Sequence, residues 1–449
     1  MMKYPKIDFK TNKFVIIGAG DTGVSIVKFL QFQSAKLLRV LDTRDNPPQI
    51  FTSVIGGKLE FANLQDADII VLSPGVSIYE EVFQQAIRHG KQVVGDIELF
   101  AQNISHWHAK VIGITGSNGK TTVTSLVGHL ALSSGYKTLI AGNIGTAVLS
   151  AWLEIEQNKI YPEIVVLELS SFQLETIYSL ELDSATVLNI SEDHLDRYRD
   201  LLEYAYVKAN IFNHCKYQVL NKDDALVNTM CRKNLPGINF GLSDAEFSLM
   251  HTDNKVFLSY DNCQILNCSQ LQVVGTHNYI NALASLALLK AIGIGGDKLV
   301  DGLKSFAGLE HRMEKIIEHN RVLYIEDSKG TNVGAVVAGV SGIDRPIHLI
   351  LGGDGKGQDF MPLRQLVIAK CRSIAIIGVD RYKIAKVLTG LVMPIQLCDT
   401  LVEAVKFCAD NASSGDAVIL SPACASWDMF DNYKHRAQVF IETVHEICK

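Results

Sequence analysis

Residues 113–122 read Gly113-Ile-Thr-Gly116-Ser-Asn-Gly119-Lys120-Thr121-Thr122, between a strand-like run, Lys110–Ile114, and a helical run, Val123–Leu132. Glycines in this position let backbone N–H groups approach a phosphate, and the lysine ammonium adds positive charge. The spacing departs from the common Gly-x4-Gly-Lys-[Ser/Thr] pattern, and an ordinary strand-to-helix turn is the alternative. Gly-Lys-Thr at the tip of the turn favours a phosphate-binding loop.

Strand-like and helical runs alternate on both sides of this loop, which is typical of α/β chains with mostly parallel sheets. A chain of 449 residues is too long to fold around a single hydrophobic core, and its length suggests three domains. We predict a Rossmann-like first domain at 1–103, a central P-loop ATPase-like α/β domain at 104–308, and a Rossmann-like third domain at 309–449. Predicted strands include Phe14–Ile17, Ile164–Leu167 and Ile347–Leu351, and alternating runs between 238 and 274 indicate hairpins.

Composition excludes several classes of protein. A hydrophobic share of 47%, a charged share of 20% and a net charge of −6 are those of a globular chain with no overall basic field for nucleic acid. The nine cysteines are scattered and contain no Cys-x-x-Cys pair. No apolar run approaches the ~20 residues of a membrane span, and glycines interrupt the N-terminal apolar run too early for a signal peptide. We therefore expect a cytoplasmic protein without membrane insertion.

A second glycine motif, Gly18-Ala-Gly20-Asp21-Thr22-Gly23, follows the first predicted strand, and Asp42 ends the next one. This arrangement matches the dinucleotide fingerprint, so NAD is one candidate ligand. The same turn can hold any diphosphate, and a purely structural turn is the other alternative. In the predicted linker Asn103–Ala109, His106 and His108 could pair on a metal, but an exposed polar connection accounts for them better.

Glu168 and His194 each follow an apolar strand of the central domain. Side chains just beyond the carboxyl ends of parallel strands converge on one crevice. A lone glutamate or histidine is more often an ordinary residue, but two beside a phosphate loop favour ligation of Mg²⁺.

Several separate motifs together resemble the Mur ligase family, specifically its D-glutamate-adding members, across nearly all of the chain. Besides those quoted, they are Glu168–Glu175, Asn189–Arg197, Asn278–Ala284, His311–Glu314, Asp327–Asn332, Gly352–Phe360 and Leu420–Asp428. Gly330 stands where alanine is expected, and Glu310 where proline is commoner. Neither change removes a functional side chain.

The resemblance implies that the three domains bind, in order, the UDP-sugar, ATP and the incoming amino acid. ATP would contact Gly116, Ser117, Asn118, Gly119, Lys120, Thr121, Thr122, Asn281, Arg312 and Asp327. Two Mg²⁺ ions would be held by Thr121, Glu168, His194 and Lys208. The UDP-sugar would contact Gly18, Asp21, Thr22, Asp42, Thr43, Arg44, Ser73, Pro74, Gly75, Asn143 and Gln173.

For the third substrate, the resemblance implies a D-glutamate site formed by Lys329, Thr331, Lys356, Ser426 and Tyr433. It also implies that Lys208 is carbamylated by CO₂, whereas the sequence alone favours an unmodified lysine. Lys120, His194 and Lys208 would form the catalytic set. The expected reaction joins D-glutamate to UDP-N-acetylmuramoyl-L-alanine through an acyl phosphate, in peptidoglycan precursor synthesis, by a protein expected to be a monomer.

Three other interpretations remain, and each has a feature against it. Another ligase of the superfamily conflicts with the motifs Asp327–Asn332 and Leu420–Asp428. An NAD-dependent oxidoreductase leaves the Lys120 loop unexplained. A non-catalytic nucleotide-binding regulator should have lost Lys120, Glu168 or His194, and all three are present.

Overall fold

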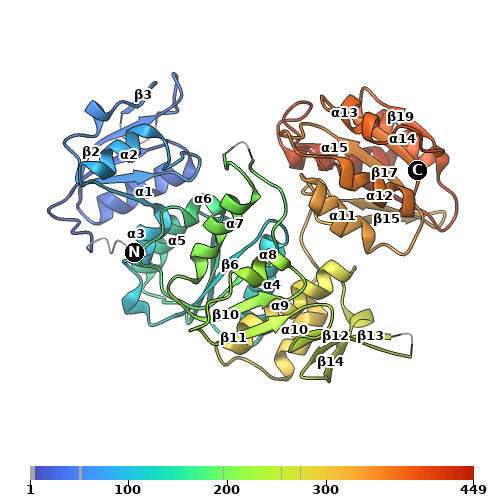
Figure 1. Cartoon of the computed structure of the whole chain (residues 1–449), viewed down its shortest axis with the longest axis horizontal. Coiled ribbons are helices and arrows are strands. Elements are labelled where there is room, and N and C mark those ends of the chain that lie inside the picture. Colours follow the sequence, from blue (N-terminus) through green and yellow to red (C-terminus); the bar gives the residue numbers. More distant parts are fainter. Residues whose placement is uncertain (1–5, 50–52, 196, 254, 274) are drawn as a thin grey trace.

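The computed structural model describes residues 6–49, 53–195, 197–253, 255–273 and 275–449. Residues 1–5 of the predicted first domain and Asp196 of the quoted motif lie outside these ranges. The described elements form three sheets, and the predicted α/β architecture is confirmed. Figure 1 shows the first and third sheets with their helices on either side of the central part. We propose domain boundaries after residues 103 and 308, because no sheet crosses them.

The first sheet has five parallel strands in the order β3-β2-β1-β4-β5. Two of its inner strands, β1 and β4, are almost wholly apolar and buried, as expected where helices cover both faces of a parallel sheet. The strands are β1 Lys13–Ile17, β2 Lys36–Asp42, β3 Val54–Gly56, β4 Ile69–Leu72 and β5 Gln92–Gly95, and the helices are α1 Asp21–Phe32, α2 Glu81–Arg88 and α3 Asp96–Ala101.

The central sheet has nine strands in the order β14-β13-β12-β11-β10-β9-β6-β8-β7. Strands β6 to β12 pair in parallel, whereas β12, β13 and β14 form antiparallel hairpins, as the alternating pattern predicts. The parallel strands are β6 Lys110–Thr115, β7 Thr138–Gly142, β8 Ile164–Glu168, β9 Leu182–Val187, β10 Cys215–Asn221 and β11 Gly237–Phe240. The hairpin strands are β12 Phe247–Thr252, β13 Lys255–Tyr260 and β14 Cys263–Asn267.

Helices α4, α9 and α10 pack together over one face of the central sheet, while α5 contacts α1 and α3 of the first domain. At that junction the Phe29 and Trp152 rings lie 4.9 Å apart, edge to face. The first domain is therefore packed firmly on the central one. The helices are α4 Lys120–Ser133, α5 Val148–Asn158, α6 Ser171–Leu174, α7 Leu201–Ala209, α8 Ala225–Thr229, α9 Thr276–Ala291 and α10 Asp297–Ser305.

The third sheet has the order β15-β16-β20-β17-β18-β19 and is parallel except for β15. The strands are β15 Glu314–His319, β16 Val322–Glu326, β17 Ile347–Gly352, β18 Cys371–Ile377, β19 Ile395–Leu397 and β20 Ala417–Leu420. The helices are α11 Val333–Ser341, α12 Met361–Lys370, α13 Arg381–Val387, α14 Leu401–Asn411 and α15 Tyr433–Ile447.

In the predicted linker both histidines are exposed, as expected, but the residues around them are packed. Residues Ser105–Trp107 form a 3-10 turn, and the Trp107 ring is buried. His106 lies 2.7 Å from the carboxylate of Glu156. Trp107 donates to the same carboxylate at 2.8 Å. His106 is therefore engaged by a carboxylate and the linker is anchored to α5. Elsewhere, no helix of the described ranges has the length and apolarity to cross a bilayer.

Candidate active site

The predicted phosphate loop lies between β6 and α4 and opens on a cavity of about 610 Å³. Gly119 has a φ of +82°, and a Cβ there would lie 2.8 Å from Asn281 Oδ1, so only glycine fits. Lys120 Nζ donates to the carbonyl oxygens of Gly116 at 2.7 Å and Ser117 at 2.8 Å. Burial lowers the pKa of the Lys120 ammonium, which Glu168 and Asp193 partly counteract. A phosphate bound at this loop would give the Lys120 ammonium an anionic partner.

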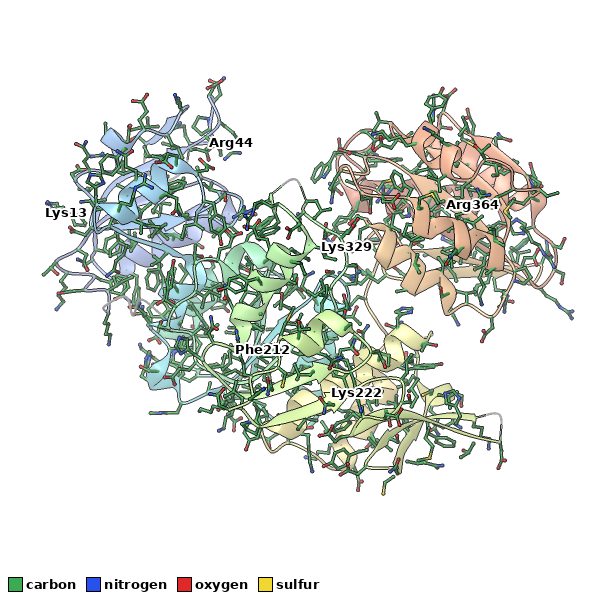
Figure 2. The ribbon with its side chains drawn as sticks, in the orientation of Figure 1. Lys13, Arg44, Phe212, Lys222, Lys329 and Arg364 are labelled. Atoms are coloured by element: carbon green, nitrogen blue, oxygen red, sulfur yellow. The ribbon has the colours of Figure 1, made fainter. Side chains whose placement is uncertain are left out.

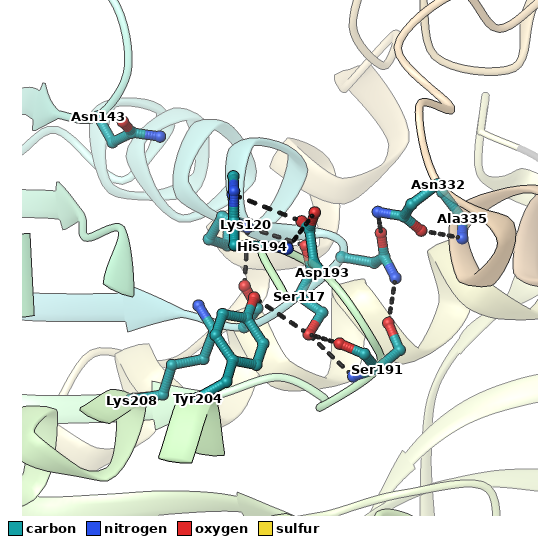
Figure 3. A network of polar contacts seen from close by, with 12 residues as sticks. Ser117, Lys120, Asn143, Ser191, Asp193, His194, Tyr204, Lys208, Asn332 and Ala335 are labelled. Atoms are coloured by element: carbon teal, nitrogen blue, oxygen red, sulfur yellow. Dashed lines mark hydrogen bonds and ion pairs between the residues drawn. The ribbon is translucent and has the colours of Figure 1, made fainter. Parts of the chain in front are cut away.

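Hydrogen bonds from a neighbouring segment hold the phosphate loop in place. Asn189 accepts the N–H of Asn118 at 2.8 Å through Oδ1 and the N–H of Ser117 at 2.9 Å through its backbone carbonyl. Ser117 Oγ donates to the Ser191 carbonyl at 3.0 Å. These bonds tie the loop to the segment that carries His194 (Figure 3). The loop is held in shape without a ligand.

Glu168 is the last residue of β8 and is buried beside the loop. Its Oε1 accepts from Asn143 Nδ2 at 2.9 Å, whereas Oε2 is buried without a hydrogen-bond partner. An unsatisfied buried carboxylate oxygen is costly, and a cation is the partner that offsets this cost best. The hydroxyl of Thr121 lines the same cavity. These hard oxygen donors fit Mg²⁺.

His194 lines the same cavity. It adopts a left-handed φ of +54°, its ring lies 4.7 Å from that of Phe172, and its Nε2 is 3.7 Å from Asp193 Oδ2. Its backbone carbonyl accepts the N–H groups of Arg197 and Tyr198 at 3.0 and 3.1 Å. The turn fixes this histidine's backbone in a conformation that non-glycine residues rarely adopt.

Lys208 is buried on α7, with Nζ 3.2 Å from Thr115 Oγ1 and 4.6 Å from the Tyr204 ring centroid. Burial, together with repulsion from Lys120, lowers the pKa of Lys208 well below its ordinary value. Burial of this kind favours the neutral, nucleophilic form of the amine. Figure 3 shows it beside Tyr204, below Lys120.

The third domain contributes two polar side chains to the lining of the cavity. Arg312 Nη2 donates to Thr121 Oγ1 at 2.9 Å across the domain boundary. Asp327 follows β16 and accepts from Ser421 Oγ at 2.6 Å and from the Met313 N–H at 3.2 Å. Burial raises the pKa of Asp327 to about 7, and lowers that of the Arg312 guanidinium. Asn281 lines the cavity as well.

Of the residues predicted for D-glutamate, Lys329, Thr331 and Lys356 line this cavity. Lys329 Nζ lies 4.0 Å from the Tyr433 ring centroid, and both line an adjoining cavity of about 480 Å³. Burial lowers the pKa of Lys329 to about 8. Ser426 is buried and is absent from the described linings of both cavities. Figure 2 labels Lys329 where the third domain meets the central one.

The residues predicted for the UDP-sugar lie mostly outside this cavity, at the carboxyl edge of the first sheet. Gly18 has a φ of +102°, and a Cβ there would collide with Ser73 Oγ. Asp42 accepts the Ala19 N–H at 2.8 Å and pairs with Arg44 at 2.7 Å, and this pairing lowers the pKa of Asp42. Figure 2 labels Arg44 there.

The other residues predicted for the UDP-sugar lie at the ends of helices and strands or in the turns between them. Asp21 and Thr22 begin α1, and Thr43 is exposed after β2. The turn Ser73–Gly75 follows β4, and Ser73 Oγ is buried without a hydrogen-bond partner. Asn143 joins the main cavity, whereas Gln173 is buried in the capping box of α6. Thr122, which was predicted to contact ATP, lies at the start of α4.

The sequence left some residues of this site unassigned. Asp193 lines the cavity and acts electrostatically on Lys120, and Thr115 accepts from Lys208. Asp193 stands directly before His194, so proximity to a predicted ligand was an available signal. Thr115 stands directly before Gly116 in the quoted glycine motif, but its hydrogen bond with Lys208 had no signal in the sequence, because only the fold brings these two residues together.

The chain is similar to known proteins over nearly its whole length. Residues 12–95, 114–289 and 311–424 match, respectively, the Mur ligase MurD-like N-terminal domain, the Mur ligase middle domain, and the Mur ligase glutamate ligase domain. The chain is 46% identical to the UDP-N-acetylmuramoylalanine--D-glutamate ligase of Chromobacterium violaceum and 44% identical to that of Nitrosomonas europaea. Each comparison covers 98% of both chains.

Solved structures share the fold at low identity. A pseudomurein peptide ligase type C from Methanothermus fervidus superposes with a TM-score of 0.62 at 18% identity, covering 97% of this chain and 100% of that one. The MurF structure from Acinetobacter baumannii gives 0.63 at 16% identity, covering 96% and 90%. These similarities extend over all three domains.

Proposed function

The chain belongs to the Mur ligase family, and on that premise we propose that it joins D-glutamate to UDP-N-acetylmuramoyl-L-alanine while ATP is converted to ADP and phosphate. Its substrates follow from the names of relatives 40–46% identical over nearly the whole chain. Such a ligase acts in peptidoglycan precursor synthesis, and so in cell-wall growth, cell shape and division.

One observation carries the proposal. The orphaned oxygen of Glu168, the ammonium of Lys120 and the hydroxyl of Thr121 share one cavity at the tip of a glycine loop. Phosphoryl transfer is catalysed mainly by positioning and by charge stabilisation, and these are the groups that it needs. No nicotinamide chemistry requires this combination.

We propose that Thr121, Glu168, His194 and a carbamylated Lys208 hold two Mg²⁺ ions. When bound, the ions would neutralise the phosphate oxygens that meet the substrate carboxylate. The carbamate forms when the neutral Lys208 nitrogen bonds to the carbon of CO₂ and loses a proton. The low pKa of buried Lys208 supports this reaction, since only an unprotonated amine is nucleophilic.

The chain's own residues then act on the reacting groups. Lys120 and Arg312 orient the phosphates, and Asn281 contacts the adenine. The acceptor carboxylate oxygen bonds to the terminal phosphorus of ATP as ADP leaves, which gives an acyl phosphate. The amine of D-glutamate next bonds to the acyl carbon, phosphate leaves, and the amine gives up a proton. Asp327, with its pKa about 7, can hold or release a proton beside Arg312.

We assign the other substrates to the outer domains. The uridine diphosphate part would lie on the Gly18 turn, Asp42–Arg44 and Ser73–Gly75, with Asn143 and Gln173 towards the muramoyl group. The two carboxylates of D-glutamate would meet Lys329, Lys356, Thr331, Ser426 and Tyr433. Cations suit a dicarboxylate, whereas a lysine-adding relative would need acids for the distal amine.

We further propose that the protein works as a cytoplasmic monomer. All nine cysteines are free thiols in the structure, which suits a reducing compartment.

The test measures phosphate release from ATP with UDP-N-acetylmuramoyl-L-alanine and, separately, D-glutamate, L-glutamate, L-lysine or meso-diaminopimelate. Only D-glutamate should support rapid turnover. Lys356→Ala should mainly raise the KM for D-glutamate, because the lost charge contacts only that substrate. Equal rates with any other amino acid would overturn the assignment.

A further inference from the structure

Arg197 lies where the first domain meets the active-site segment, and none of the roles above uses it. Its side chain is only 10% exposed. Towards the first domain, Nη1 donates to the Pro74 carbonyl at 3.2 Å and Nη2 to the Val76 carbonyl at 3.3 Å. These carbonyls belong to, or directly follow, the turn assigned to the UDP-sugar.

Within the central domain the same guanidinium is held by a carboxylate. Nη2 and Nε donate to the two oxygens of Glu175 at 2.5 and 3.3 Å. Glu175 is almost wholly buried and also accepts from Tyr198 Oη at 2.7 Å. The planar fork of arginine can serve a carboxylate and two carbonyls at once, and a lysine ammonium cannot reproduce that geometry.

Arg197 also touches the His194 segment by two routes. Its backbone N–H donates to the His194 carbonyl at 3.0 Å and so closes the turn that gives His194 its left-handed φ. Its guanidinium carbon lies 3.9 Å from the centre of the Phe172 ring, whose centre in turn is 4.7 Å from that of His194. One side chain therefore contacts the sugar-nucleotide turn and the ring against which His194 packs.

A second set of hydrogen bonds joins the same two domains but does not reach the His194 segment. Glu98 accepts the N–H groups of Tyr178 and Ser179 at 2.8 and 2.9 Å and the Ser179 hydroxyl at 2.7 Å. Together with the packing of α1 and α3 on α5, this tie attaches the domains without Arg197. Attachment alone does not account for a buried arginine that spans both sites.

We propose that Arg197 is a positioning residue that sets the distance between the sugar-nucleotide turn and His194, so that the acceptor carboxylate meets the phosphoryl group. This inference rests on the proposed function. It predicts that loosening Arg197 impairs use of the UDP-sugar and of Mg²⁺ while ATP binding is preserved.

The experiment compares Arg197→Lys with two controls in the full-length protein. Arg199→Lys alters an exposed arginine two residues away that pairs with Glu203, and Glu98→Gln weakens the other interdomain tie. We expect Arg197→Lys to lower kcat/KM for UDP-N-acetylmuramoyl-L-alanine by roughly 10- to 100-fold, the scale of small misplacements. The Mg²⁺ concentration for half-maximal rate should rise, and the KM for ATP should stay within about twofold.

The controls separate positioning from stability. Arg199→Lys should match the wild type, and Glu98→Gln should lower the melting temperature without shifting the Mg²⁺ requirement. Arg197→Lys with unchanged kinetics, or Glu98→Gln with the same kinetic pattern, overturns the positioning role alone. If the wild-type protein releases no phosphate with these substrates, the proposed function fails and this inference fails with it.

Discussion

At the scale of single residues, burial governs the charge of two ionisable groups, one in the lining of the cavity and one packed beside the phosphate loop. Lys208 and Asp327 are both removed from water, and burial disfavours the charged form of each. A lysine with a strongly lowered pKa and an aspartate with a pKa of about 7 are both unusual. Both therefore give measurable predictions.

Lys208→Ala should lower turnover by roughly 100-fold or more, because the proposed carbamate supplies metal-binding oxygens where charge develops. Short carboxylic acids such as acetate should restore part of the rate by placing oxygens in the space left by the side chain. Phosphate release measures both effects. Lys304→Ala, on the exposed side of α10, serves as control, and full activity of Lys208→Ala without acetate would contradict the proposal.

Asp327 predicts a pH-dependent stability. Its folded pKa, about 7, exceeds the 3.8 that is ordinary for an aspartate, so the folded state binds more protons between these values. Stability contributed by this site therefore falls as pH rises from about 4 to about 7, with a slope approaching 1.4 kcal/mol per pH unit. Relative to wild type, Asp327→Asn should gain stability across that window and then level off.

Urea unfolding of wild type and Asp327→Asn at pH 5, 6, 7 and 8 checks this sign. The asparagine also loses part of the hydrogen bonding from Ser421 and Met313, which shifts the difference by a constant. Asp399→Asn, at an exposed carboxylate, sets the baseline. A difference between Asp327→Asn and wild type that stays flat with pH would show that Asp327 is ionised throughout.

At the scale of elements, the glycine loop depends on one backbone conformation. Gly119→Ala places a methyl group 2.8 Å from Asn281 Oδ1 at a φ of +82°, so both strain and collision result. Strain alone costs about 1–2 kcal/mol. The KM for ATP should rise strongly. Gly135→Ala, with a φ of +97° and open space around it, should lower stability comparably and leave that KM unchanged.

How far the elements could be predicted depended on burial. Apolar runs such as β1, β8 and β17 were predictable because both faces of their sheets are covered, and the hairpin strands β12, β13 and β14 lie within the range predicted for hairpins. Strand β15, with glutamates, a lysine and a histidine on a sheet edge, has no such run, and β19 has only three residues. Neither was predicted. The motifs indicated residues of the cavity, but the partner of Lys208 depends on tertiary packing.

At the scale of the whole molecule, the two outer domains are attached unequally. The first domain packs on the central one through α1 and α3 and is also held by hydrogen bonds of Glu98 and Arg197. The third domain contacts the phosphate loop through two hydrogen bonds, Arg312 to Thr121 at 2.9 Å and Asn332 to Asn118 at 3.2 Å. Figure 1 shows the third domain apart from the first. Motion that completes the site should therefore belong to the third domain.

Small-angle scattering should detect that motion. Addition of ATP, Mg²⁺ and UDP-N-acetylmuramoyl-L-alanine should reduce the radius of gyration, because phosphates draw Arg312 and Lys329 towards Lys120. Lys120→Ala should compact less under the same conditions. A radius that ligands leave unchanged in the wild type would argue that the domains are already in their working arrangement.

The hydrogen bonds that Lys120 makes to its own loop, and Arg312 to Thr121, have a consequence for inhibitor design. Both cations already have oxygen partners before a nucleotide arrives, so binding exchanges one set of bonds for another. A compound that pushes these side chains aside without offering acceptors of its own will bind weakly, however well its shape fits. We expect compounds that carry anionic groups for both Lys120 and Arg312 to bind more tightly than compounds that lack them.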